Sequence, residues 1–323
     1  MPNHAPFSGL APRAGAWAPS LRCLGFVAIA CGTLATAGAA TRVPPPPASR
    51  SSAGSIALQR FVLPGPVAGV MARVDLRDPR VSLNLVLADG PAAGATADCT
   101  GRLDVPSAVA RRHDFAVAVN ASYFSAAAKE VGGRKVHFFV GNCATPVGWH
   151  AADGKVRTRP TQAHIQATLV VHADGRLSMH PSLEQLPAVA RCSVSGNALV
   201  VAGGQVIRRP ADGVRHPRTA VGVSRDGGTL LLVAVDGRQE HSRGVSLAEL
   251  GELMKGFGAH DALNLDGGGS TALVAKDHAT GVFAVANRPS DLALEFPELR
   301  VERPVVDVLG VVVREAGSSP MRH

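Results

Sequence analysis

Apolar residues along this chain fall into short runs bounded by glycine and polar turn residues, a pattern typical of β-strands. Strands are expected at 56–62, 67–75, 81–87, 115–120, 136–140, 167–172, 198–202, 219–223, 230–236, 262–266, 271–274 and 305–313. Asp-Gly pairs separate several of these runs, at 153–154, 174–175, 212–213 and 226–227. Both residues of such a pair tolerate positive φ, so we expect hairpin turns there.

Two segments carry the start signals of helices instead. The first is expected from Val105 to His113, with Asp104 as its N-cap and Pro106 in its first turn. The second begins at Ser246, which forms a capping box with Glu249 and precedes apolar residues at helical spacing. With no internal repeat and no second linker, the sequence predicts an α+β fold. We expect a single domain over residues 55–315, with a mixed, strand-rich sheet, a few packed helices and a tail at 316–323.

The first 40 residues have the pattern of an export signal. Arg13 and Arg22 precede an apolar run at 24–37 that ends in small residues, and no acidic residue comes before it. Glycines interrupt the run, which argues against a permanent membrane span. Residues 41–54 are proline-rich and predict a semi-rigid linker. The protein is therefore expected to be periplasmic or extracellular, with a lipid anchor on Cys31 as the alternative.

Composition excludes several classes of protein. Hydrophobic residues make up 46% of the 323 residues, enough to build a sizeable core. The formal net charge is +8, from 33 Lys and Arg against 25 Asp and Glu, and the positive charges are scattered. A coding bias towards Arg explains this charge, and attraction to anionic glycans or phosphates is the functional alternative. One Tyr and two Trp offer little for nucleic-acid bases to stack on, so nucleic acid is not an expected partner.

Three cysteines follow the predicted export signal: Cys99, Cys143 and Cys192. In an exported protein we expect one disulfide and one free thiol. The spacing does not decide the pairing, and Cys143–Cys192 is the pair we favour. No Cys-x-x-Cys or His-x-x-x-His spacing predicts a transition-metal site, and no cofactor is expected, although calcium at the Asp-bearing loops stays open.

The most unusual segment runs from Asp261 to Thr271, where an apolar strand ends in Asp266 and three glycines. The two-residue period of a strand places Asn264 and Asp266 on one face. Gly267, Gly268 and Gly269 allow close approach of a ligand and can turn backbone N–H groups towards an anion. The absence of Gly-Lys-Ser/Thr excludes a nucleotide P-loop. A glycine-rich turn without function is the alternative.

A second apolar strand ends in Asp236 and is followed by Gly237 and Arg238. Taken alone, this Asp-Gly pair is explained as well by a hairpin turn. The strand precedes the capped helix, and that helix leads to the strand that ends at Asp266. Such a strand–helix–strand order favours a crossover that brings both strand ends to the same sheet edge. We therefore expect Asp236 and Asp266 to face one cleft as paired carboxylates.

Further polar residues flank other predicted strands. Arg218 and Thr219 open the strand before the Asp236 strand, and Asn120 ends the strand that leads to Tyr123. Arg288 follows late in the chain. Each of these, taken alone, fits a surface turn.

Together these segments resemble the phosphodiester glycosidase family. The matching motifs are Asn120–Phe124, Arg218–Gly222, Val235–Gln239, Asn264–Thr271, Asn287–Ser290 and Glu302–Val305. They occur in the family's order over about residues 60–313, and the glycine motif is the most specific. The chain has Ala121-Ser122 where the family often has Gly-Gly, so the pocket wall there is expected to differ. Residues 125–215 match no motif, and substrate choice is expected to lie there.

The resemblance implies hydrolysis of a sugar-1-phosphate diester at the anomeric C–O bond, with a phosphorylated glycan as partner. Asp266 and Asp236 are the expected catalytic carboxylates, because such reactions pass through an oxocarbenium-like state. The expected substrate-binding residues are Asn120, Arg218, Thr219, Arg238, Asn264, Gly267, Gly268, Gly269, Ser270, Thr271 and Arg288. Among these, the arginines and loop amides would clamp the phosphate, and the two asparagines would orient sugar hydroxyls or an acetamido group.

Two alternatives remain open. Ser270 lies in a near match to the serine-hydrolase elbow, but an elbow needs a helix after the serine and residues 271–274 are predicted as strand. A non-catalytic glycan-binding module on the same fold is the other alternative. Retained sugar-phosphate binding without turnover would identify it.

The signal pattern predicts that the mature protein begins near Thr41. N-terminal sequencing of the exported material measures this directly. Retention of the first 40 residues, or a lipid on Cys31, would contradict the expectation.

Overall fold

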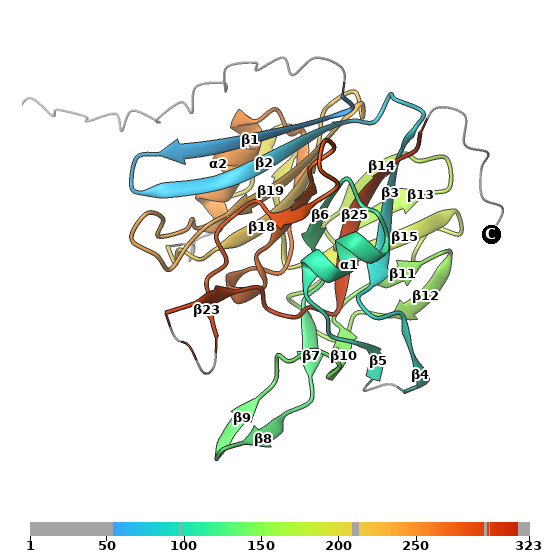
Figure 1. Ribbon diagram of the computed structural model, residues 1–323. Helices are drawn as coiled ribbons and strands as arrows, with labels where there is room; N and C mark the ends of the chain where they lie inside the picture. The colour runs from blue at the N-terminus through green and yellow to red at the C-terminus, as the bar shows by residue number, and fades with distance from the viewer. Residues whose placement is uncertain (1–53, 97–98, 209–212, 294–295, 297, 316–323) are drawn as a thin grey trace, which may run out of the picture. The chain divides into compact units, whose positions relative to one another are not determined.

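The computed structural model describes residues 54–96, 99–208, 213–293, 296 and 298–315. The predicted signal peptide, residues 41–53 of the linker and the predicted tail lie outside these ranges. The described part is dominated by antiparallel β-sheets, with two α-helices and one 3-10 turn (Figure 1). Neither of these helices is long and apolar enough to cross a membrane.

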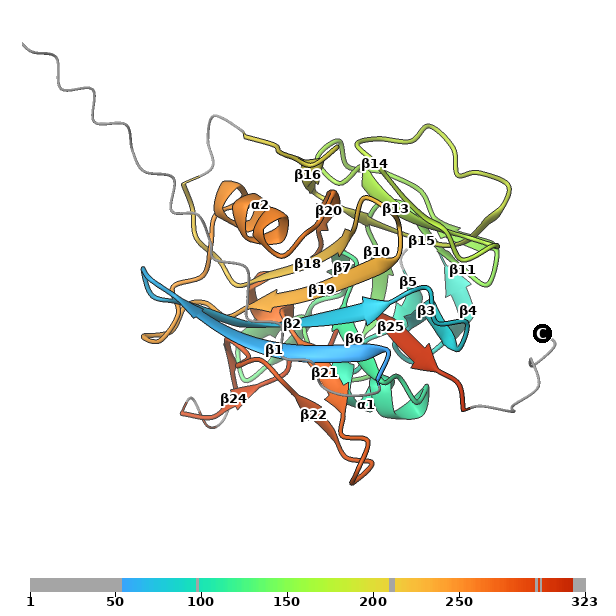
Figure 2. The same ribbon diagram turned by 90° about the horizontal axis from the view of Figure 1, so that it is seen from above.

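A seven-stranded sheet carries the strands on which the polar motifs lie. Its order is β1-β2-β19-β18-β20-β16-β17, and all neighbours are antiparallel. The strands are β1 (Ile56–Leu63), β2 (Val67–Asp75), β16 (Ala198–Ala202), β17 (Gln205–Val206), β18 (Arg218–Val223), β19 (Thr229–Val235) and β20 (Asp261–Asn264). Helix α2 (Leu247–Gly256) packs on one face of this sheet, while β6, β21 and helix α1 lie on the other side (Figure 2).

Two five-stranded sheets complete the framework. One has the order β22-β21-β6-β25-β3, made of β3 (Val81–Leu87), β6 (Val117–Asn120), β21 (Leu273–Lys276), β22 (Phe283–Val285) and β25 (Asp307–Val313). Helix α1 (Pro106–Arg112) packs against it. The other has the order β12-β11-β15-β13-β14, made of β11 (His150–Ala152), β12 (Lys155–Thr158), β13 (Ala167–His172), β14 (Leu177–His180) and β15 (Ala190–Gly196).

Smaller sheets are attached to this framework. One contains β4 (Pro91–Thr96), β5 (Cys99–Arg102), β7 (Phe124–Ala126) and β10 (Cys143–Pro146). The hairpin of β8 (Lys129–Val131) and β9 (Arg134–Val136) projects away from it, as Figure 1 shows. A last pair joins β23 (Asp291–Leu292) to β24 (Arg300–Val301).

The main hydrophobic core is shared by the three large sheets. Leu232 and Leu263 enter it from the seven-stranded sheet, Val119 and Leu309 from the β3–β6–β25 sheet, and Leu169 from the third. All five side chains are fully buried. Burial of a side chain of this size stabilises the fold by roughly 1.5–3 kcal/mol, so the core fixes the three sheets against one another.

The crossover predicted from the strand–helix–strand order is confirmed. β19 and β20 both pair antiparallel with β18, so they run parallel to each other with one strand between them. Helix α2 makes the connection and starts at the predicted capping box, in which Ser246 and Glu249 each accept the other's backbone N–H. The segments that follow Val235 and Asn264 therefore leave the sheet at the same edge.

Several local predictions need correction. The predicted strand at 136–140 is wrong beyond Val136, because Phe138 turns away to pack edge-on against Phe124, with ring centroids 5.8 Å apart. Asp104 is not the N-cap of α1: the N-cap is Val105, and Asp104 instead pairs with Arg112. The fold is also more β-dominated than the expected α+β class, although mixed elements are present.

Most strands that the sequence did not predict have four residues or fewer, and the longer β15 carries buried polar residues. In β15, Ser195 is fully buried yet accepts a hydrogen bond from the Trp149 N–H at 2.8 Å and lies 2.9 Å from the Thr168 hydroxyl. A buried serine satisfied in this way gives no apolar signal in the sequence. The search for short apolar runs therefore missed most of the third sheet.

The expected Cys143–Cys192 pairing is wrong. The disulfide joins Cys99 to Cys143, and Cys192 is a buried free thiol. Antiparallel pairing of β5 with β10 brings the first two cysteines together, whereas Cys192 on β15 packs in the main core. Burial raises the pKa of the Cys192 thiol to about 11, so it stays protonated and unreactive at neutral pH.

We expect Cys143→Ala to lower the free energy of unfolding by up to about 4 kcal/mol, because the bond closes a 44-residue separation. Cys192→Ala removes only core contacts and should leave the disulfide intact. Denaturant unfolding measures the first effect, and thiol counting before and after unfolding checks the second. One reactive thiol in the native protein, or equal destabilisation by reduction and by Cys192→Ala, would contradict this assignment.

Candidate active site

The glycine loop follows β20 and is fixed by backbone hydrogen bonds on both sides. The N–H groups of Leu265, Asp266 and Gly268 donate to the carbonyls of Thr219, Ala121 and Pro217 respectively. A Cβ at Gly267 would lie 2.7 Å from the Pro217 carbonyl oxygen, and one at Gly269 would lie 2.1 Å from Asp291 Oδ1. The loop is therefore glycine-rich partly because neighbouring protein groups approach its backbone closely.

The Asn120 side chain is hydrogen-bonded to three segments of the chain. Its Nδ2 donates to the Asp266 carbonyl at 2.7 Å. Its Oδ1 accepts the Thr219 hydroxyl at 2.7 Å and the Ala272 N–H at 3.1 Å. Asn120 and Thr219 are both fully buried. Both ends of the loop are therefore held by one amide, which a hydrophobic residue of similar size could not replace.

Asp266 carries a partly buried carboxylate whose Oδ1 accepts the Gly267 N–H at 2.9 Å. Burial raises the pKa of Asp266 to about 6. The Ser270 hydroxyl, the charge of Arg303 and the Gly267 N–H oppose this rise, and the charge of Asp307 adds to it. A carboxyl group with such a pKa changes charge close to neutral pH, as groups at functional sites often do.

Asp307 is an acid near Asp266 that the sequence analysis missed. It is fully buried and accepts the Ser122 N–H at 2.8 Å and the Ser122 hydroxyl at 2.5 Å, while His150 Nε2 lies 3.2 Å from its Oδ2. The one signal in the sequence was a single Asp inside the apolar run 305–313. Ser122 stands where the resembling family often has glycine. This departure from the family motif supplies the hydroxyl that donates to Asp307.

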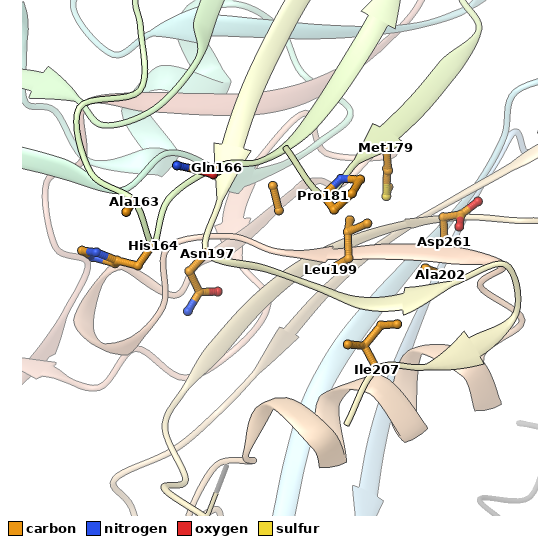
Figure 3. Close-up of a pocket in the computed structure, with 11 residues that line it drawn as sticks. Ala163, His164, Gln166, Met179, Pro181, Asn197, Leu199, Ala202, Ile207 and Asp261 are labelled. Carbon is orange, nitrogen blue, oxygen red and sulfur yellow. The ribbon is translucent and has the colours of Figure 1, made fainter. Parts of the chain in front are cut away.

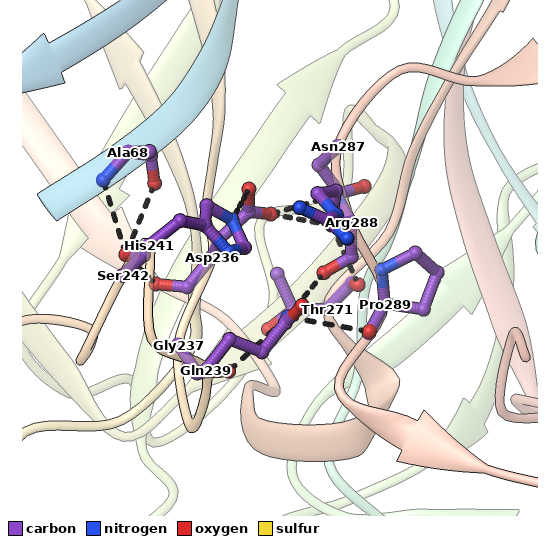
Figure 4. Close-up of polar contacts among 10 residues, drawn as sticks. All are labelled: Ala68, Asp236, Gly237, Gln239, His241, Ser242, Thr271, Asn287, Arg288 and Pro289. Carbon is purple, nitrogen blue, oxygen red and sulfur yellow. Dashed lines mark hydrogen bonds and ion pairs between the residues drawn. The ribbon is translucent and has the colours of Figure 1, made fainter. Parts of the chain in front are cut away.

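Asp236 is held from two sides by the network in Figure 4. Its Oδ1 accepts the Arg288 N–H at 2.8 Å and Asn287 Nδ2 at 3.3 Å, and its Oδ2 lies 3.1 Å from His241 Nε2. The side chain is 6% exposed, while that of His241 is 31% exposed. Both carboxylate oxygens are thus engaged, and the sequence analysis missed His241, which follows the Asp-Gly turn without any motif.

Asn287 connects the Asp236 network to the glycine loop. Its Nδ2 also donates to the Thr271 carbonyl at 3.2 Å (Figure 4). Its Oδ1 accepts the Leu273 N–H at 2.7 Å. The structure therefore brings Asp236 and the segment that begins at Asp266 into one hydrogen-bonded unit. This hydrogen-bonded bridge connects the two strand ends that the sequence predicts to contribute to one site.

The three expected arginines lie in different surroundings. Arg218 is buried, and its Nε donates to the Val245 carbonyl at 3.1 Å. Arg238 is exposed, and its guanidinium lies 3.1–3.6 Å from where a Cβ of Gly268 would be. The Arg288 side chain is exposed. Arg238 has φ +58°, in the left-handed region that non-glycine residues seldom adopt.

Arg303 is a further cation beside the loop. It forms a two-bond ion pair with Asp291, at 2.7 and 3.0 Å, and stacks on the Phe138 ring at 4.1 Å from its centroid. Its guanidinium also approaches the backbone of Gly269. The motif Glu302–Val305 was noted in the sequence, but the position of Arg303 next to the glycine loop was not. Glu302 has another role, because its carboxylate accepts the Ser107 N–H at the start of α1.

Asn264 faces away from bulk solvent and is fully buried. Its Nδ2 donates to Tyr123 Oη at 3.1 Å and to Asn197 Oδ1 at 2.8 Å. Burial and the negative charge of Asp266 raise the pKa of the Tyr123 hydroxyl, so it stays protonated. Ser270 and Thr271 are buried in and just after the 3-10 turn Gly268–Ser270.

A cavity of about 580 Å³ borders Asn197 but contains none of the predicted site residues (Figure 3). Its polar lining residues are His164, Gln166, Asn197 and Asp261, among apolar residues of β14, β16 and the segment after β17. This cavity therefore does not mark the glycine loop. Within the described ranges, no group of three or more His, Cys, Asp or Glu side chains is arranged to hold a metal ion.

A sequence model of the phosphodiester glycosidase family matches residues 113–312. This span includes the residues of the glycine loop, the Asp236 network and the arginines described above. Among curated proteins, the SPbeta prophage-derived uncharacterized protein YomE of Bacillus subtilis (strain 168) is 43% identical over 58 residues. That match covers 18% of this chain and 9% of the length of YomE.

Solved structures share the fold. The catalytic domain of zebrafish N-acetylglucosamine-1-phosphodiester alpha-N-acetylglucosaminidase, auto-inhibited by its pro-peptide, has a TM-score of 0.60 at 23% identity. The similarity covers 82% of this chain and 85% of that chain. A hypothetical protein from Synechocystis has a TM-score of 0.52 at 17% identity, over 80% and 62% of the two chains. A candidate exported protein from Burkholderia pseudomallei K96243 has a TM-score of 0.52 at 18% identity, over 76% and 74%.

The two strand-end aspartates should respond oppositely to replacement by Asn. Between about pH 4 and 6 folded Asp266 keeps a proton that the unfolded chain releases, so the free energy of unfolding falls as pH rises through this window. Asp266→Asn removes the charge and should stabilise the protein by up to about 3 kcal/mol at pH 7, with no gain below about pH 4. Asp236→Asn keeps an amide oxygen for the N–H groups of Asn287 and Arg288 but loses the negative charge that these groups share with His241, and should destabilise the protein by about 2 kcal/mol. Denaturant unfolding at pH 4 and 7 measures both, and equal effects of the two variants would refute this assignment.

Proposed function

The chain belongs to the phosphodiester glycosidase family, and on that premise we propose that it hydrolyses the anomeric C–O bond of a sugar-1-phosphate diester. The observation that carries the proposal is the partly buried carboxylate of Asp266, with its pKa near 6, at the start of a glycine loop. Asn120 holds that loop, and the guanidinium of Arg238 lies next to Gly268. The negative charge of Asp266 suits the sugar side of the bond to be broken, and the positive charge of Arg238 suits the phosphate side.

Asp266 is proposed to act on the sugar side of this bond. Departure of the phosphate leaves positive charge at the anomeric carbon, and an ionised carboxylate stabilises that charge. Because Asp266 is partly removed from water, its charge acts more strongly there than it would in solution. A phosphate ester is a good leaving group, so strong help from a general acid is less necessary than for an alcohol.

The phosphate is proposed to bind mainly to side chains. The Gly267 N–H donates to Asp266 Oδ1 and the Gly268 N–H to the Pro217 carbonyl, so these two loop amides are already engaged. Arg238 is exposed beside the loop and is the cation best placed to receive an anion there. Arg288 follows Asn287 at the same network and would act as a second contact. Charge-assisted bonds of this kind are shorter and stronger than neutral ones.

Asp236 is proposed to position other groups. Both of its oxygens have protein partners, and the partner on one side is the partly exposed His241. An Asp that accepts from one ring nitrogen fixes the tautomer and orientation of the imidazole, which leaves the other nitrogen for the substrate. Asn120, Thr219 and Asn264 are fully buried and hydrogen-bonded to other protein groups. They would therefore hold the loop in place and not contact the sugar.

A serine-hydrolase function has less support. Ser270 ends a 3-10 turn, and strand β21 begins at Leu273, two residues after Thr271. A nucleophile elbow requires a helix at this point. The glycan-binding module remains the second candidate, because binding and turnover use the same anion-binding groups.

Export is part of the proposal. The apolar N-terminus supports it, and so does the Cys99–Cys143 disulfide, because such bonds persist mainly in oxidising compartments. The substrate would then be a phosphorylated glycan of the envelope or of the extracellular space.

We expect Asp266→Asn to lower turnover of a sugar-1-phosphate diester by roughly 10³-fold or more, equivalent to about 4 kcal/mol of transition-state stabilisation. Because the carboxylate form is required, wild-type kcat should rise with pH through about 6. Release of reducing sugar measures both. Asp261→Asn is the matched control, since Asp261 lies at the other end of the same strand and contacts His260. Full activity of Asp266→Asn sinks the proposed site, and binding without turnover by the wild type identifies the binding module.

A further inference from the structure

A basic hollow lies next to the proposed phosphate site and is not needed for a single phosphodiester. Its volume is about 790 Å³, within the range of small-molecule binding sites. The residues that line it are Arg215, Arg238, Gln239, Glu240, Arg243 and Arg300. They come from the segment before β18, the turn after β19 and strand β24. Arg238 belongs to both places, because its guanidinium also lies beside Gly268 of the glycine loop.

The charges of this hollow are not balanced by its own acids. Arg215 is neutralised by an ion pair with Glu249. Among the residues that the structure describes, the Arg238 side chain has one hydrogen-bond contact, with His216 at 3.5 Å. Burial and the charges of Arg218 and Arg238 lower the pKa of that histidine, so it is neutral near pH 7. Arg300 donates to the Ser290 carbonyl at 3.3 Å. Arg238, Arg243 and Arg300 against Glu240 leave a local charge of about +2, and exposed arginines at this density attract anions.

We propose that this hollow binds a second phosphate group on the leaving-group side of the substrate. The inference rests on the proposed function and names its substrate class: a glycan chain whose units repeat the phosphodiester, and not an isolated sugar phosphodiester. One phosphodiester carries one negative charge, and Arg238 with Arg288 more than neutralises it at the glycine loop. Because Arg238 is used there, Arg243 and Arg300 against Glu240 leave about +1 in the hollow for the next phosphate. A repeating chain that leaves the loop past Arg238 enters the hollow and brings the next phosphate to Arg243 and Arg300.

Binding tests the hollow independently of turnover. The probe is a trimer of glycerol phosphate, titrated calorimetrically into Asp266→Asn protein that also carries Arg243→Gln and Arg300→Gln. The control pair is Arg225→Gln and Arg134→Gln, two exposed arginines on the β18–β19 hairpin and on β9, with the same loss of charge. We expect the hollow pair to weaken binding at least tenfold and the control pair less than twofold, with the difference reduced by added salt.

Turnover separates this inference from the proposed function. The substrates are two sugar-1-phosphate diesters, one with a neutral leaving-group alcohol and one whose alcohol carries a further phosphate. We expect wild-type kcat/KM to be at least tenfold higher for the second, and the hollow pair to remove that preference. Equal binding loss in the hollow and control pairs overturns the inference. A galacturonate trimer that binds as tightly as the glycerol phosphate trimer, or more tightly, also overturns it. Absence of turnover on both substrates contradicts the proposed function alone, because the binding arm still decides the hollow.

Discussion

The arrangement of this protein depends on one buried amide. Asn120, at the end of β6, is hydrogen-bonded to the start of the glycine loop, to its end and to Thr219 on β18. The β3–β6–β25 sheet and the seven-stranded sheet are thereby joined at the point where the proposed chemistry takes place. In a fully buried position each of these bonds would be costly to leave unmade, so the loop has one conformation and not an ensemble of turns.

The crossover from β19 through α2 to β20 supplies the second constraint. It directs two strand ends to one edge, and the Asn287 side chain then connects the two segments that leave there. Two aspartates that both end an apolar strand before a glycine therefore have different surroundings and different roles. Asp236 is saturated with donors and stabilises its surroundings, while Asp266 is partly desolvated with few donors, which raises its pKa. A desolvated charge costs stability, a trade that functional sites commonly make.

The glycines of the loop serve the protein as well as a ligand. Gly267 and Gly269 have no room for a Cβ, because the Pro217 carbonyl and the Asp291–Arg303 pair lie against them. The same packing places Arg303 close to Asp266 and stacks Phe138 on its guanidinium. The segment after the β8–β9 hairpin is thereby tied to the loop, although residues 125–215 carry no recognisable motif.

The sequence by itself determined whatever depends on neighbours along the chain. Short apolar runs located β2, β3, β13 and β16 to the residue, and a serine and a glutamate three positions apart located the start of α2. The order strand–helix–strand was enough to predict that two strand ends share an edge, because crossovers of this kind have few alternatives. Family membership also followed from motifs that are local. The pairing of cysteines, the Glu302 cap of α1 and the contacts of Asp307, His241 and Arg303 could not be predicted in this way. They depend on which strands pair and pack, which is set by burial and hydrogen bonding between residues far apart in the chain, and only the tertiary structure decided them.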